Sequence, residues 1–201
     1  MSNYPAKMAV VICDFVVVDG NQQNGNPSPF CFLNAFSVLR VERIGRGFRF
    51  DEIRQFEEPG TGGGDLLMSL ADQIDEDTSL AGYRLDQMIG ALVRIPCGDP
   101  RDAECRPALL KLQAALAHEV QDAFWYDRNR HRSLEDLARD YDLPAEWHRK
   151  SRQANPNMLE RELSAKAQTV WLSIAHELLP SIDLRRATAD YDQWRTANAI
   201  A

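Results

Sequence analysis

Asp14 interrupts a run of apolar, β-forming residues, VVICDFVVVDGN, which spans residues 10–21. A carboxylate within a buried strand is costly unless a metal ion, a proton or a polar partner compensates it. A second aspartate, Asp86, lies in the stretch LAGYRLDQM at residues 80–88. These two acids are the first candidates for chemistry, and what they can do depends on the elements that hold them.

Three segments in the first third of the chain have the composition of strands. Apolar and β-branched residues dominate residues 7–19 and 29–43, and apolar residues partly alternate with polar ones over 47–57. Short polar links separate the three segments, so we expect an antiparallel three-strand meander. Asp14 then lies in the first strand of that meander.

The rest of the chain is mainly helical in its pattern. A small-residue strand that leads into a helix is expected over residues 78–95, with Asp86 at the junction. Further helices are expected after the break at 59–64, after Pro107, over 133–144 with Ser133 as the N-cap, and over 157–182. Residues 121–129 could continue a helix or form a short strand. Trp171, on the apolar face of the last helix, is expected in the core.

This order of elements, with one aspartate in the first strand and another where a later strand meets a helix, resembles the DnaQ-like 3′-5′ exonuclease family of the ribonuclease H-like fold. The stretch VVICDFVVVD is similar to the first motif of that family, LAGYRLDQMIGALVRI to the second, and RHRSLEDLARDYDLP to the helix before the third. The resemblance covers residues 8–180. It implies an α/β fold whose central mixed sheet, the meander plus parallel strands, is flanked by α-helices.

In that family, four carboxylates hold two divalent metal ions that activate water and stabilise the leaving oxygen. By the resemblance, Asp14 and Asp86 match the acids of the first two motifs and are the candidate metal ligands. Val16 stands where the first motif has Glu, and Ala165 or Lys166 stands where the third motif has Asp. These two departures from the motifs of the family predict that the protein holds no metal cofactor, or only weakly bound Mg²⁺ or Mn²⁺.

Two other charged residues affect this site. If the Lys166 ammonium projects into the pocket, we expect it to neutralise Asp14 and Asp86 in place of a metal ion. Asp122 follows the possible short strand; we expect it at the surface, with a place in the pocket as a further metal ligand as the alternative. An active enzyme with rearranged ligands would use Asp14, Asp19, Asp86 and Asp122.

The formal net charge of −7 disfavours the binding of a polyphosphate to the surface as a whole, so any contact with nucleic acid has to be confined to a local basic region. The clearest basic cluster consists of Arg128, Arg130 and Arg132. Trp125 and Tyr126 precede this cluster and offer faces on which bases could stack. These five residues are the candidate nucleic-acid contacts, with solvated surface charge as the alternative explanation of the arginines.

The chain of 201 residues has 44% apolar and 26% charged residues, which is typical of one folded domain, expected here over 1–201. No apolar stretch reaches the roughly 18 to 20 residues that span a bilayer, so we expect a cytoplasmic protein with no membrane contact. The four cysteines include no CxxC pair, which argues against zinc and disulfides.

The sequence therefore predicts an exonuclease-like protein that has lost hydrolysis and binds single-stranded nucleic acid or a protein partner through the remnant cleft. An active metal-dependent 3′-5′ exonuclease with rearranged carboxylates is one alternative. A protein-interaction module with no nucleic-acid role is the other, and the acidic balance of charge favours it. The oligomeric state is left open.

Overall fold

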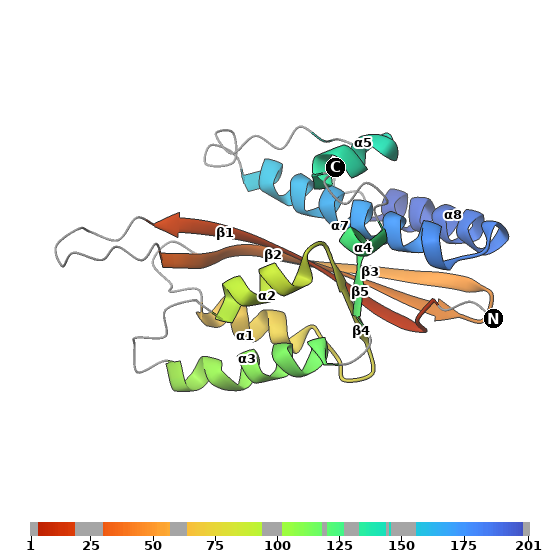
Figure 1. Ribbon diagram of the computed structural model, residues 1–201. Helices are drawn as coiled ribbons and strands as arrows, with labels where there is room; N and C mark the ends of the chain where they lie inside the picture. The colour runs from red at the N-terminus through yellow and green to blue at the C-terminus, as the bar shows by residue number, and fades with distance from the viewer. Residues whose placement is uncertain are drawn as a thin grey trace.

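The computed structural model describes residues 4–18, 30–56, 64–93, 102–117, 120–126, 133–143, 145 and 156–198. They form a five-stranded mixed sheet with helices on both faces (Figure 1). The chain is thus an α/β protein, as expected. None of the described helices is long and apolar enough to cross a membrane.

The sheet consists of three long antiparallel strands and two short parallel ones. The strands are β1 Lys7–Val18, β2 Phe30–Ile44, β3 Gly47–Phe56, β4 Ser79–Gly82 and β5 Val120–Asp122. Their order across the sheet is β3-β2-β1-β4-β5, in which β1 to β3 pair antiparallel and β4 and β5 continue parallel to β1. The predicted meander and the predicted mixed sheet are both confirmed. Of the two possibilities for the stretch after residue 120, the structure shows a short strand followed by one helical turn.

Each face of the sheet is covered by its own layer of helices (Figure 1). One layer contains α1 Gly64–Asp72, α2 Leu85–Val93 and α3 Asp102–Leu116. The other contains α4 Ala123–Tyr126, α5 Leu134–Asp140, α7 Pro156–Leu178 and α8 Ser181–Ala197. Because successive side chains of a strand point to opposite faces, β1 contributes to both cores: Val10 and Ile12 pack towards α7, while Ala9 and Val11 pack towards α1 and α2.

Two helical features differ from the expectations. Helix α3 begins at Asp102 and contains Pro107, whereas the sequence predicted a helix only after that proline. Helix α8 was not predicted at all, because only Ala187 and Tyr191 are buried along its polar length. The predicted cap of α5 is confirmed: the Ser133 side chain accepts from the backbone N–H of Asp136, and the Asp136 side chain accepts from the backbone N–H of Ser133.

A β-bulge lies beside Asp14. Asp14 pairs with Ala35 on β2 but the next residue, Phe15, pairs with Leu33, so Asn34 is an extra residue on the β2 side. The Asn34 side-chain amide donates a hydrogen bond of 2.9 Å to the Asp14 carboxylate. The bulge therefore supplies one of the polar partners that the charge in this strand requires.

Gly82 lies at the end of β4, the strand that pairs with β1, and the Leu85 side chain packs closely against it. A Cβ atom built there would lie 2.6 Å from Leu85 Cδ2 and 3.3 Å from the Val11 carbonyl oxygen. We expect Gly82→Ala to lower the free energy of unfolding by about 1 to 3 kcal/mol, the usual cost of overpacking. Urea denaturation followed by circular dichroism measures this change.

Gly90 provides the matched control, because it lies inside α2 and a Cβ atom there meets nothing within 4 Å. Gly90→Ala should leave the protein unchanged or raise the free energy of unfolding by about 0.5 to 1 kcal/mol, since glycine is a poor helix former. Equal effects of the two substitutions would contradict the close approach at Gly82.

Candidate functional site

A cavity of about 570 Å³ lies where β1 meets the elements that carry the predicted motifs. Its walls come from β1, the loop from β4 into α2, the start of α5 and the middle of α7. The lining residues are Val11, Ile12, Cys13, Phe15, Tyr83, Arg84, Gln87, Met88, Ala91, Ser133, Leu134, Glu135 and Lys166. The cavity thus combines an apolar floor with two cationic side chains and one carboxylate.

Asp122 builds the loop that forms one wall of the cavity. Its carboxylate accepts three hydrogen bonds of 2.9 Å each, from the backbone N–H groups of Arg84, Leu85 and Phe124. The residue is 2% exposed, so the expectation of a surface charge is wrong. A buried carboxylate is costly without hydrogen-bond donors of this kind, and here two of the three donors come from the segment that enters α2. Asp122 therefore fixes the position of the wall rather than facing a ligand.

Arg84 follows β4 in an unusual backbone conformation. Its φ angle is +52°, in the left-handed region that non-glycine residues rarely adopt. The side chain extends over aromatic rings, with Cζ 4.8 Å from the Phe124 ring centre and 5.6 Å from that of Tyr83. Its Nε atom is buried and has no hydrogen-bond partner among the residues that the structure describes. Arg84 is a charged lining residue that was not predicted from the sequence, where only its position two residues before Asp86 marks it.

Lys166 reaches the cavity from α7, which is the condition under which the sequence analysis gave this residue a role. Its ammonium lies 2.6 Å from the Glu162 carboxylate, one helical turn earlier. Both side chains are shielded, with 17% of Lys166 and 6% of Glu162 exposed. The structure thus identifies Lys166, rather than Ala165, as the lining residue, and shows Glu162 as a carboxylate partner that was not expected.

The thiol in the cavity floor belongs to Cys13, which precedes Asp14. Burial raises the pKa of this thiol, and the nearby Asp14 carboxylate raises it further. The thiol is therefore protonated at neutral pH, and a protonated thiol is a poor nucleophile and a poor metal ligand. Cys13 serves as a small apolar group in the floor, in agreement with its place in an apolar run.

The structure brings together only some of the predicted site residues. Asp14 and Asp86 are not among the described residues that line the cavity, although their neighbours Cys13 and Gln87 are. Asp86 is exposed in the first turn of α2. Among the described residues, no group of three or more His, Cys, Asp or Glu side chains could hold a metal ion.

The predicted nucleic-acid contacts are only partly described. Trp125 is 59% exposed on α4, which leaves its ring available for stacking. The Tyr126 hydroxyl instead donates a hydrogen bond to the Gln121 side chain, and its ring packs against the core below α7. Asp19, Arg128, Arg130 and Arg132 lie outside the described residues.

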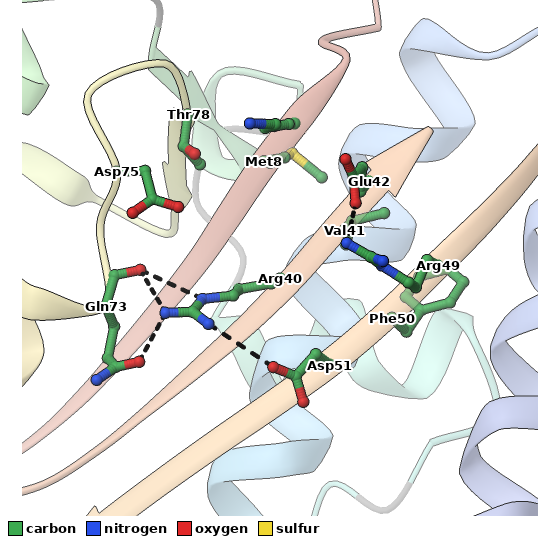
Figure 2. Close-up of a pocket in the computed structure, with 11 residues that line it drawn as sticks. Met8, Arg40, Val41, Glu42, Arg49, Phe50, Asp51, Gln73, Asp75 and Thr78 are labelled. Carbon is green, nitrogen blue, oxygen red and sulfur yellow. Dashed lines mark hydrogen bonds and ion pairs between the residues drawn. The ribbon is translucent and has the colours of Figure 1, made fainter. Parts of the chain in front are cut away.

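A second cavity, of about 390 Å³, lies towards the other end of the long strands and contains mostly paired charges (Figure 2). Arg40 reaches across it to the Gln73 side chain at 2.7 Å and to Asp51 at 3.7 Å. Arg49 pairs with Glu42 on the neighbouring strand. Because these cations already have acceptors, this cavity offers less to an anionic ligand than the one beside β1.

No protein-family model, curated protein or solved structure matches this chain.

Proposed function

We propose that the protein is a ribonuclease H-like relative of the DnaQ-like 3′-5′ exonucleases that has lost metal-dependent hydrolysis and binds single-stranded nucleic acid in the cavity beside β1. The observation that carries this proposal is Lys166: an ammonium lines the cavity at one of the two positions, 165 and 166, where the resemblance calls for an acid. The combination of an antiparallel meander with parallel strands supports the same fold.

The donor set does not fit the two-metal chemistry of that family. Val16 has no metal-binding atom, and of the two residues that could stand at the third-motif acid, Ala165 has no metal-binding side chain and Lys166 carries a positive charge. The Asp122 carboxylate already accepts three backbone hydrogen bonds. Hydrolysis with two metal ions needs more carboxylate ligands than Asp14 and Asp86 can supply. The proposed function therefore contains a binding step and no hydrolytic step.

The lining of the cavity suits one nucleotide unit of a strand. Arg84 attracts a phosphate group, which is the main source of affinity for nucleic acid, and the Lys166 ammonium adds a second donor beside its partner Glu162. Ile12, Phe15 and Met88 provide apolar contact for a sugar or a base. The net charge of −7 disfavours polyphosphate elsewhere on the surface, so binding should concentrate at this cavity.

A binding and degradation assay tests the proposal. The pure protein is incubated with end-labelled single-stranded DNA and RNA, with Mg²⁺, with Mn²⁺ and with a chelator. We expect a salt-sensitive gel shift without shortening of either strand. Lys166→Ala should weaken binding and reduce the slope of log affinity against log salt by about one, as expected for the loss of one phosphate contact.

Lys111→Ala is the matched control, because Lys111 lies on α3 in the opposite layer of helices. It should leave affinity and salt slope unchanged. Metal-dependent degradation that disappears in both Asp14→Ala and Asp86→Ala would reject the proposal that the protein has lost hydrolysis. The absence of any shift with either polymer would reject nucleic-acid binding and favour an interaction role with a protein partner.

A further inference from the structure

Arg84 carries a charge that the described part of the protein does not compensate. Other half-buried arginines of the sheet have carboxylate partners: Arg40 with Asp51 at 3.7 Å, Arg43 with Asp183 at 3.1 Å and Arg54 with Glu160 at 2.9 Å. Arg84 forms no ion pair among the described residues, and its Nε atom is shielded from water without an acceptor. A buried, unsatisfied cationic donor is costly, and such a group points to a missing anion.

The surroundings of Arg84 hold it in place. The Asp122 carboxylate binds the backbone N–H groups of Arg84 and Leu85 and so secures the left-handed conformation at φ +52°. The rings of Tyr83 and Phe124 lie against the guanidinium, and they pack edge to face with their centres 5.8 Å apart. Strained backbone that the surrounding structure maintains in this way is concentrated at functional sites. The guanidinium is thus positioned before any ligand binds.

The charges of the cavity favour an anion at Arg84. The N–H donors of a guanidinium lie in its plane, so contacts with aromatic rings leave the donors unused. The Lys166 ammonium lines the same cavity but already has Glu162 as a partner at 2.6 Å. Glu135 contributes the one carboxylate among the described lining residues, and it reduces the positive potential without forming an ion pair with Arg84.

We infer that Arg84 is the anchor of a phosphate-binding subsite in the cavity beside β1, and that it takes a phosphate of the bound strand as a two-oxygen acceptor. The source of the phosphate rests on the proposed function, whereas the subsite itself rests on Arg84, its ring contacts and its unsatisfied donor. A phosphate oxygen in the cavity provides the acceptor that the Nε atom lacks, and guanidinium groups bind phosphate in this two-point manner.

Calorimetric titration at low ionic strength tests the subsite. The probes are inorganic phosphate, adenosine, adenosine 5′-monophosphate and a single-stranded oligonucleotide. We expect the monophosphate to bind at least about tenfold more tightly than adenosine, and Arg84→Gln to weaken the monophosphate and the oligonucleotide about tenfold, the loss of one charge-assisted contact. Glu135→Gln should strengthen both. Arg185→Gln, which removes an exposed charge from α8 in the same way, should change neither.

The results separate the subsite from the proposed function. Unchanged binding of both ligands to Arg84→Gln would overturn the subsite and leave strand binding intact. Binding of the monophosphate that depends on Arg84, without binding of the oligonucleotide, supports the subsite and rejects strand binding. Inorganic phosphate that binds as tightly as the monophosphate identifies free phosphate as the source. No binding of any probe rejects both. If Arg84→Gln does not fold, Glu135→Gln provides the test. The subsite is then overturned if Glu135→Gln binds the monophosphate no more tightly than the unmodified protein does.

Discussion

Trp171→Ala is expected to lower the free energy of unfolding by about 3 to 5 kcal/mol, the loss typical of a deleted core aromatic. Trp171 has no exposed surface and lies at the centre of the core below α7. Its ring stacks on Tyr191 at 4.9 Å and meets Phe50 edge to face at 5.0 Å. Its indole N–H donates a hydrogen bond of 3.1 Å to the Tyr4 hydroxyl. The substitution therefore leaves a large cavity and removes the hydrogen-bond donor to Tyr4.

Guanidinium denaturation followed by far-ultraviolet circular dichroism measures this effect without relying on tryptophan fluorescence. Trp125→Ala is the matched control, because the same side chain is 59% exposed on α4. It should change the free energy of unfolding by no more than about 0.5 kcal/mol, as surface substitutions usually do. A loss below about 1 kcal/mol in Trp171→Ala would show that the ring does not occupy the centre of the core.

Asp122→Ala is expected to lower the free energy of unfolding by about 3 kcal/mol or more. Each hydrogen bond to a charged group contributes about 1.5 to 3 kcal/mol, and a buried donor left without an acceptor costs about 1 to 3 kcal/mol. The carboxylate binds three backbone N–H groups, and alanine leaves all three without it. The loop that holds Arg84 should loosen at the same time, so phosphate binding should weaken as well.

Asp122→Asn and Asp86→Ala complete this experiment. Asparagine keeps one oxygen acceptor but presents an amide to the remaining donors. Asp122→Asn should therefore lower the free energy of unfolding by less than Asp122→Ala does. Asp86 is an exposed carboxylate in the first turn of α2, where its loss should cost about 0.3 to 1 kcal/mol. Equal effects of Asp122→Ala and Asp86→Ala in urea denaturation would show that the three backbone hydrogen bonds do not stabilise the loop.

The elements that the sequence predicts correctly have a strong local signal. Apolar, β-branched runs mark β1 and β2, and the pairing of Ser133 with Asp136 marks the start of α5. Helix α8 lacks such a signal, because it buries only a small and an aromatic residue, Ala187 and Tyr191, among polar neighbours. Its position depends on packing against β3, which lies far away in the sequence.

The candidate site was harder to predict for the same reason. The role of Asp122 depends on N–H groups of Arg84 and Leu85, which lie 38 and 37 residues earlier in the chain. Arg84 has no recognisable motif of its own, and what draws attention to it is a buried Nε atom without an acceptor among the described residues. Lys166 could be singled out from the sequence only through the proposed resemblance, in which residue 165 or 166 stands where the third motif has an acid.

The extra residue Asn34 reverses the alternation of side chains between the two faces of the sheet along β2. After it, Phe36 and Val38 face the layer of α1 to α3, while Ala35 faces the layer of α7. Before it, the odd-numbered Leu33 faces the layer of α1 to α3, opposite to Ala35. A strand with one uninterrupted alternation would place both odd-numbered residues on the same face. One inserted asparagine therefore provides an amide for Asp14 and also decides which of the two cores receives Leu33.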